Sequence, residues 1–449
     1  MESVAQSAIL FKVPSEEQLE AMVGRFQAVL GDVRLVAVVR LMLQGIIGAR
    51  SPVASRMAGS VPRTVRKVFY VAKRVYRFCQ NPRFGHADLL VPACADTAER
   101  ANELTRQGYI LVAVDPVNLE KPYGRAMEAL QRVPRKASAR GISRTEDLQR
   151  QKKRKELIWG YPLMVALALG WRNIGLTYAH LFSSRAADFV SQNVEVAHAV
   201  VRTLALLVGH VVRFVADSGF DDQKLFAFID RQPAQFVIRL CHDRSIEVWN
   251  ERLQRWEPEA LLDFSAVLWQ PITFMTRLKR HHRWERAKVT LGYQKVRLPE
   301  IDLLCWLIVA HTEGFQDPWL LLSNVPISDD QTALQLWQDY RRRGGIEAFF
   351  RCLQERGLDI EDVRLRSLEA IRRLVSLVLT AAQLVWELPR RLPAPLVEWL
   401  RQLGGKLGTH ADKDGPYVLL YGLSKVFEAL MVLQTCPSPQ DSPPTSGCG

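Results

Sequence analysis

Short apolar runs that end in a polar residue alternate with amphipathic stretches through the middle of the chain. The run Tyr109–Asp115 (YILVAVD) is rich in apolar and β-branched residues, which is the pattern of a buried strand. Four similar runs follow, and two stretches between them carry apolar residues at helical spacing. The predicted strands are Tyr109–Asp115, Pro162–Leu169, Asn173–Phe182, Val211–Asp217 and Ala234–Cys241, and the predicted helices are Ala186–Leu207 and Asp221–Arg231.

The order of three strands, helix, strand, helix and strand is the order of the ribonuclease H-like fold. In this α/β fold the first and fourth strands lie side by side in a mixed five-stranded sheet, so residues at their ends become neighbours. Asp115 and Asp217 stand at those two ends. A turn aspartate is the alternative interpretation of each, and Asp221 and Asp222 are rivals of Asp217. Asp217 fits better because it closes a strand, whereas Asp221 stands at a predicted helix start.

A third acid, Glu347, stands on a helix predicted over residues 330–353. The polar residues at spacings of three, four and seven share one stripe of that helix, and they are Tyr340, Arg343, Glu347 and Gln354. A separate apolar stripe can bury against a core, and it consists of Ile346, Phe349, Phe350 and Leu353. The core then comprises residues 109–241 and 326–390. Residues 242–325 carry β-like runs, and we interpret them as a β-rich insertion or an extension of the sheet.

The two ends of the chain have helical patterns. Residues 1–108 are predicted to be a helical region, in which Val61–Phe78 is strongly basic and either contacts DNA or carries solvated charges. A long amphipathic helix is predicted over Leu365–Leu388, followed by a helical region over residues 391–435. The tail 436–449 is rich in Pro, Ser and Gly, and we expect it to be disordered. Residues 132–155 hold ten Lys or Arg against two acids, which predicts a mobile basic loop.

The composition of the 449 residues narrows the choice of partner. A formal net charge of +13 favours a polyanion, with nucleic acid first and an anionic membrane second; a basic protein without a nucleic acid partner is the alternative. The seven cysteines show no zinc-site spacing, and we expect reduced thiols in a cytosolic protein. We predict no signal peptide and no membrane segment, and we expect a cytoplasmic protein.

Three converging carboxylates in a basic protein predict two divalent metal ions, Mg²⁺ or Mn²⁺. Asp115 would bridge both ions, while Asp217 and Glu347 would each hold one. Such a site can hydrolyse a DNA phosphodiester and then use the freed 3′-OH to attack another one, which is strand transfer. Arg343 suits a phosphate contact through its bidentate fork, and Tyr340 can donate to the same phosphate. A surface Tyr and Arg on a charged helix are the alternative interpretation of that pair.

These residues resemble the DDE transposases of the insertion-sequence-four family over roughly 109–385. The late signature of that family is Tyr, two residues, Arg, three residues, Glu, six residues and Lys; Tyr340, Arg343 and Glu347 match it, while Gln354 stands in place of the lysine. Arg351 is the candidate substitute for that lysine. The second-acid signature matches Asp217-Ser218-Gly219-Phe220. By resemblance, Trp319 in Pro318–Ser323 stacks on a base flipped from the transposon end; a core tryptophan is the alternative.

The resemblance implies double-stranded DNA as the partner, both as terminal inverted repeats and as target. The N-terminal region would bind the repeats, and the C-terminal region would help to form a homodimer in the synaptic complex. Basic residues of the loop add candidate DNA contacts, which are Lys152, Lys153, Arg154 and Lys155. Two other functions remain open: a metal-dependent DNA nuclease without strand transfer, and a catalytically inactive DNA-binding regulator derived from a transposase.

Overall fold

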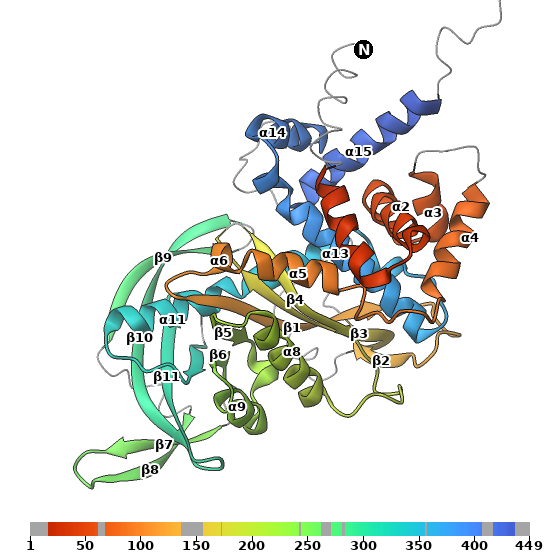
Figure 1. The fold of residues 1–449 in the computed structure, drawn as a ribbon. Helices are drawn as coiled ribbons and strands as arrows, with labels where there is room; N and C mark the ends of the chain where they lie inside the picture. The colour runs from red at the N-terminus through yellow and green to blue at the C-terminus, as the bar shows by residue number, and fades with distance from the viewer. Residues whose placement is uncertain are drawn as a thin grey trace, which may run out of the picture.

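A large mixed sheet with helices on both faces forms the centre of this α/β protein (Figure 1). The computed structural model describes residues 17–61, 68–135, 156–171, 173–241, 244–261, 271–280, 283–315, 317–354, 357–405 and 416–435. Twelve strands in these ranges belong to the one sheet. Most of the predicted basic loop and the whole predicted tail lie outside the described residues, and so do Lys152, Lys153, Arg154 and Lys155.

Five strands in the middle of the chain form one half of the sheet. They are β1 (Tyr109–Glu120), β3 (Leu157–Leu169), β4 (Ile174–Leu181), β5 (Val211–Ala216) and β6 (Ala234–Arg239). Their order is β4-β3-β1-β5-β6, in which β1 is antiparallel to β3 and parallel to β5. The prediction that the first and fourth predicted strands are neighbours is therefore confirmed. Residues 109–114 of β1 and 212–216 of β5 are buried, as strands covered on both faces require.

Two local predictions about this half of the sheet were wrong. Strand β1 does not end at Asp115, because its residues Pro116–Glu120 continue the ladder with the long strand β3. The basic loop does not begin at residue 132, since β2 (Gln131–Pro134) pairs with the start of β3. Val133 is buried in that pairing, so one apolar residue among basic ones suffices to extend the sheet.

The segment between β6 and the third acid extends the same sheet. Strand β12 (Trp319–Ser323) pairs with β6, and β11 (Leu303–Thr312) and β10 (Arg283–Leu298) follow it outward. The remaining strands are β7 (Ser245–Asn250), β8 (Arg255–Ala260) and β9 (Ile272–Arg280). The β7–β8 hairpin projects from the lower end of the molecule (Figure 1). Of the two predicted alternatives for this segment, the structure has the extension of the sheet.

Helices cover the sheet on both faces. On one face, α8 (Gln192–Leu206) and α9 (Gln223–Asp230) share an apolar core with β1, β5 and β6. On the other face the long helix α13 (Leu368–Arg391) lies across β4 (Figure 1). This second core also includes most of the N-terminal helices. None of the helices in the described ranges has both the length and the apolar run needed to cross a bilayer.

The N-terminal and C-terminal helices gather around α13. They are a helix over residues 17–30, α2 (Val33–Ala49), α3 (Ala54–Gly59), α4 (Val68–Cys79), α5 (Val91–Glu99), α6 (Ala101–Leu104), α14 (Ala394–Leu403) and α15 (Pro416–Thr435). Buried arginines of α13 hold this arrangement: Arg373 donates to the carbonyl oxygens of Phe84 and Cys79, and Arg372 donates to that of Leu181. Helix α13 therefore joins the N-terminal helices to the sheet.

Candidate active site

The first two acids of the candidate site come from adjacent parallel strands. Asp115 lies within β1, and Asp217 directly follows β5. The ladder pairs Ala113 with Val215, so Asp115 and Asp217, each two residues further on, stand level across the two strands. Asp217 also caps the short 3-10 turn Ser218–Phe220 by accepting a hydrogen bond from the Gly219 amide at 2.9 Å. Strand pairing thus brings together two acids separated by about a hundred residues.

The third acid lies just after a break between two helices, so the prediction of one continuous helix was wrong. Helix α11 (Asp330–Arg342) ends before Arg343, and α12 (Gly344–Leu353) begins after it. The pair Gly344-Gly345 has low helix propensity, which explains why the helix is interrupted here. Glu347 lies in the first turn of α12. The polar stripe is therefore divided between two helices that meet at Arg343.

Arg343 links Glu347 to Asp115. Its Nη1 donates to Asp115 Oδ2 at 2.9 Å, and its Nη2 donates to Glu347 Oε1 at 2.7 Å. The side chains of Arg343 and Asp115 are 14% and 15% exposed, whereas Glu347 is 54% exposed. One guanidinium thus holds a buried carboxylate of the sheet and an exposed carboxylate of α12, and the site opens to solvent on the Glu347 side.

The cluster carries an excess of negative charge. Three carboxylates face one guanidinium, and the pKa of Asp115 is raised to about 7 by burial first and by the negative charge of Asp217 next. Arg343 lowers the pKa of Asp115, and Glu347 raises it further. A carboxyl group that is buried among like charges binds either a proton or a cation. The electrostatics of the cluster therefore favour an additional positive charge beside Asp115.

Two aromatic residues lie against the arginine. Tyr340 is buried, and its ring is 5.1 Å from that of Trp319 in an edge-to-face arrangement with an interplanar angle of 77°. The Arg343 guanidinium carbon lies 5.9 Å from the Tyr340 ring centroid. Trp319 is half-buried and also packs near Trp337. The structure thus places Trp319 and Tyr340 with the acids, and Trp319 is in part a packing residue.

Arg351 and Gln354, the two residues considered for the family's lysine position, have different surroundings. Arg351 is exposed on α12, and its Nε donates to the backbone oxygen of Glu347 at 3.3 Å. Gln354 is the C-cap of α12, and its Nε2 is buried with no hydrogen-bond partner in the described part of the chain. Gln354 therefore ends the helix instead of continuing the polar stripe.

The chemistry of the donors fits a hard divalent cation, because all three are carboxylates. Within the described ranges, however, no group of three or more acidic, histidine or cysteine side chains is close enough to hold a metal ion. Arg343 takes up one oxygen each of Asp115 and Glu347. The three carboxylates are therefore suitable ligands for a metal ion, and the positive charge that they contact in this structure is the guanidinium of Arg343.

A second cluster beside the site was missed from the sequence. Asp339, the residue before Tyr340, is fully buried and accepts hydrogen bonds from Arg213 of β5 and Tyr109 of β1, both at 2.6 Å. Gln335 donates to its other oxygen at 2.9 Å. The signal that could have found it is Arg213, a charge in the middle of the apolar strand VVRFVA. This cluster fixes α11 on the strands that carry the first two acids.

Comparison with known proteins gives one family match. Residues 170–384, just under half of the chain, match the family model of the transposase DDE domain. The matched stretch includes Asp217 and Glu347 and begins after Asp115. Similarity is also found to a cryo-EM structure of the piggyBac transposase synaptic complex with hairpin DNA, with 9% identity, a TM-score of 0.39, and coverage of 90% of this chain and 82% of that chain; likeness at this level supports no conclusion. No curated protein matches the chain.

Proposed function

We propose that the protein is a DNA transposase that cleaves transposon ends and joins them to target DNA. The observation that carries the proposal is the cluster of Asp115, Asp217 and Glu347 around Arg343. The match of residues 170–384 to the transposase DDE domain supports it. In this proposal the order β4-β3-β1-β5-β6 is the ribonuclease H-like core, and the chain is a cytoplasmic member of the insertion-sequence-four family.

Mg²⁺ or Mn²⁺, two ions to a site, would be held by Asp115, Asp217 and Glu347. When bound, such ions supply charge stabilisation to the attacking and leaving oxygens of a phosphodiester displacement. Asp115 has to lose its proton before it can serve as a ligand, and its pKa of about 7 makes that loss possible near neutral pH.

The remaining residues of the site position DNA in this proposal. The planar fork of Arg343 already donates to two carboxylate oxygens, one of Asp115 and one of Glu347, and the same fork suits two oxygens of one phosphate. Trp319, half-buried and packed edge-to-face on Tyr340, is the proposed stacking surface for a base that leaves the duplex. Arg351, exposed one turn beyond Glu347, is a further phosphate contact.

Helix α4 is the proposed contact for transposon ends. Four of its residues line a pocket of about 360 Å³, and they are Tyr70, Lys73, Arg74 and Arg77. Phe69 and Tyr70 are 67% and 57% exposed. A helix that combines exposed aromatic rings with three positive charges suits the backbone and grooves of DNA. The net charge of +13 agrees with such a partner, and a homodimer would hold the two ends together.

Cleavage of a duplex that carries the element's own ends tests the proposal. Glu347→Gln is expected to abolish strand cleavage in Mg²⁺ or Mn²⁺ and to leave end binding unchanged, because it removes a ligand charge and keeps the side-chain shape. Glu398→Gln is a matched control on α14, since that side chain is 50% exposed. Full cleavage by Glu347→Gln would contradict the assignment. Hydrolysis products without joined products would identify a nuclease without strand transfer.

A DNA-binding regulator that does not cleave is the second candidate. It is favoured by Gln354, which stands where the resembling family has lysine and which caps α12. The engagement of both Asp115 and Glu347 by Arg343 favours it as well. End binding with no nicking in either metal ion, by a chain that retains all three acids, would establish the regulator.

A further inference from the structure

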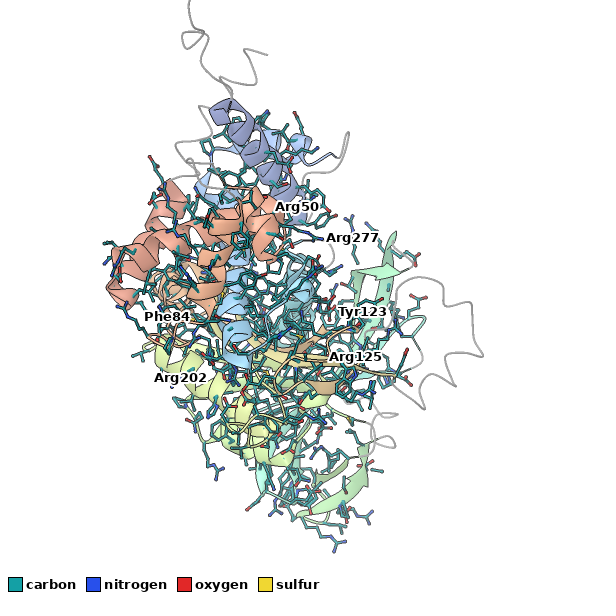
Figure 2. All side chains as sticks on the ribbon, turned by 90° about the vertical axis from the view of Figure 1, so that its right-hand side faces the viewer. Arg50, Phe84, Tyr123, Arg125, Arg202 and Arg277 are labelled. Atoms are coloured by element: carbon teal, nitrogen blue, oxygen red, sulfur yellow. The ribbon has the colours of Figure 1, made fainter. Side chains whose placement is uncertain are left out.

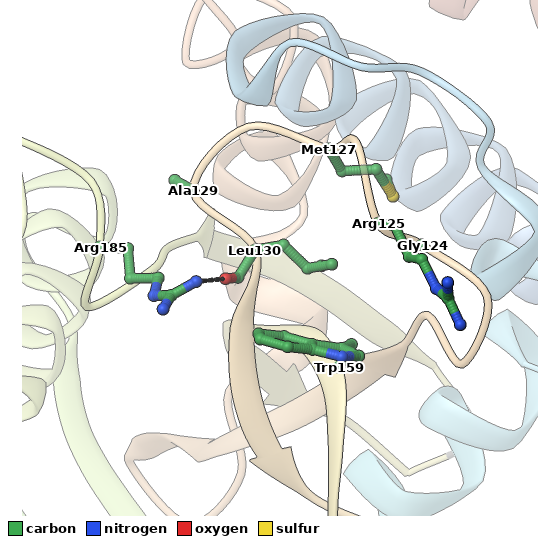
Figure 3. A pocket seen from close by; sticks show the side chains of 7 residues that line it. All are labelled: Gly124, Arg125, Met127, Ala129, Leu130, Trp159 and Arg185. Atoms are coloured by element: carbon green, nitrogen blue, oxygen red, sulfur yellow. Dashed lines mark hydrogen bonds between the residues drawn. The ribbon is translucent and has the colours of Figure 1, made fainter.

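A pocket far from the carboxylates combines an indole ring with arginines. It opens beside the connection between β1 and β2, has a volume of about 460 Å³, and is lined by Gly124, Arg125, Met127, Ala129, Leu130, Trp159 and Arg185 (Figure 3). That volume lies within the range of small-molecule sites, roughly 300–1,000 Å³. None of the seven lining residues is acidic. The pocket therefore offers an apolar floor with positive charge and no opposing carboxylate in its lining.

Figure 3 shows Trp159 at the base of the pocket, with Arg125 and Arg185 on opposite sides. Arg185 is fixed by a 2.9 Å hydrogen bond from its Nη1 to the backbone oxygen of Leu130. The guanidinium carbons of Arg132 and Arg185 lie 4.2 and 5.6 Å from the Trp159 ring centroid. Arg125 is exposed at the other side. A flat aromatic surface between cationic groups is the arrangement that binds a nucleobase and its phosphate.

We propose that this pocket binds one unpaired nucleotide of a DNA strand. The base lies on the Trp159 indole, and the phosphates before and after it lie beside Arg125 and Arg185 on its two sides. Tyr123, two residues before Arg125 and 94% exposed, provides a second stacking surface for the adjoining base; Figure 2 labels Tyr123 just above Arg125. The choice of a DNA strand over other nucleotides as the ligand rests on the proposed function. The aromatic floor and the arginines of the pocket are observed independently of that function.

The pocket is separate from the catalytic cluster and lies beyond the end of β1, the strand that carries Asp115. Lys121, at the end of β1, is six residues beyond Asp115, which at about 3.3 Å for each residue is roughly 20 Å. At about 3.4 Å for each nucleotide of one strand, that distance corresponds to about six nucleotides. A strand whose phosphodiester lies at Asp115 therefore reaches the pocket about six nucleotides away. The Trp319–Tyr340 pair, by contrast, lies beside Arg343 of the catalytic cluster.

Binding of a fluorescent 15-nucleotide oligo(dT) to the full chain, followed by anisotropy, tests the pocket. Loss of one stacked base costs about 1–3 kcal/mol, so Trp159→Ala is expected to weaken binding about 5- to 150-fold. Trp159→Phe keeps an aromatic face and is expected to retain most of the affinity. The double variant Arg125→Ala with Arg185→Ala is expected to reduce the slope of log K against log salt concentration by about 1.4, which is about 0.7 for each of two phosphates.

Trp171→Ala is the matched control, because Trp171 is 70% exposed and has Arg106 over its ring at 4.4 Å in a different pocket. Equal affinities of wild type and a folded Trp159→Ala variant, or equal losses in the Trp159 and Trp171 variants, would overturn the site. Competition by dTMP at concentrations similar to the oligonucleotide would overturn the DNA strand as the ligand.

The nicking assay keeps this inference distinguishable from the proposed function. If the wild-type chain nicks no DNA but Trp159→Ala weakens oligonucleotide binding, the proposal for the pocket stands and the transposase assignment is contradicted. If the wild-type chain nicks DNA but Trp159→Ala leaves oligonucleotide binding unchanged, the transposase assignment stands and the proposal for the pocket is contradicted.

Discussion

Two carboxylate–arginine clusters stand side by side where the third-acid helices meet the sheet, and they differ in how their charges are matched. Asp339 is fully buried, is paired with Arg213, and accepts further hydrogen bonds from Tyr109 and Gln335. We call this set the closed cluster. Asp115, Asp217, Glu347 and Arg343 form the open cluster, in which three negative charges meet one positive charge and Glu347 is exposed.

This difference in charge matching indicates different roles for the two clusters, one structural and one able to bind a ligand. Every oxygen of Asp339 has a donor, so the closed cluster stabilises one position of α11 and offers nothing to a ligand. In the open cluster three carboxyl groups surround the guanidinium of Arg343, and the raised pKa of Asp115 reflects the free-energy cost of ionising it there. Neighbouring pairs of the same residue types can therefore be assigned different roles from charge balance and exposure alone.

The largest expected effect comes from deleting one charge of the open cluster. Asp217→Asn should reduce DNA nicking by several orders of magnitude, as loss of a central catalytic group does. Asparagine still caps the turn at Gly219, so the free energy of unfolding should stay the same or rise. Nicking rates together with denaturant unfolding measure both quantities. A strongly destabilised Asp217→Asn variant would remove the distinction between the clusters.

The same kind of substitution in the closed cluster should mainly lower stability, in contrast to Asp217→Asn. Asp339→Asn leaves the buried charge of Arg213 without a counterion and should lower the free energy of unfolding by about 3–5 kcal/mol. Urea denaturation of this variant beside Asp115→Asn provides the comparison. Equal stability of Asp339→Asn and wild type would show that the closed cluster is not the support of α11.

A third effect is the dependence of stability on pH. The pKa of Asp115 is about 7 in the folded chain against 3.8 in the unfolded one, so the folded state binds the proton more tightly. The contribution of Asp115 to the free energy of unfolding is at most about 4 kcal/mol. It is fully present below pH 3.8 and is lost as the pH rises through 7.

The measurement is the difference in unfolding free energy between wild type and Asp115→Asn at several pH values in EDTA. Wild type should lose stability relative to the variant between about pH 4 and 8, and Mg²⁺ at pH 8 should restore part of the loss by binding the folded state. A constant difference over this range would contradict the raised pKa.

The smallest effect is expected where charge is kept and geometry is changed. Arg343→Lys retains one positive charge but cannot form two parallel hydrogen bonds to Asp115 and Glu347. Nicking should fall about 10-fold, the lower end of the cost of losing an orienting partner. Arg401→Lys on α14 is the control, since Arg401 is in the last turn of a peripheral helix. A loss as large as that of Asp217→Asn would mean that Arg343 does more than orient.

The sequence predicted what depends on local pattern. The five core strands and the two helices between them follow from apolar runs and their spacing, and the adjacency of Asp115 and Asp217 follows from the order of those strands. The break at Arg343 was missed although Gly344-Gly345 signals it, because helical spacing of Tyr340, Arg343 and Glu347 suggested continuity. Strand β2 was missed because its basic residues outweigh the one buried residue, Val133.

Other features depend on contacts that no local pattern contains. The bond between Arg213 and Asp339 joins residues 126 positions apart, and sequence alone shows only an unexplained charge in a strand. The Trp159 pocket joins the β1–β2 connection, the start of β3 and the segment after β4, none of which is distinctive by itself. The pKa of Asp115 likewise depends on burial and on Asp217, which exist only after folding.

Helix α13 also determines when the protein can fold. Its Arg373 binds the carbonyl oxygen of Cys79 across 294 positions of the chain, and its apolar residues complete the core of the N-terminal helices. During synthesis those helices therefore emerge long before the element that covers them. The N-terminal helices therefore complete their packing only after α13 has been synthesised and has left the ribosome, so their core stays open during the synthesis of roughly three hundred further residues.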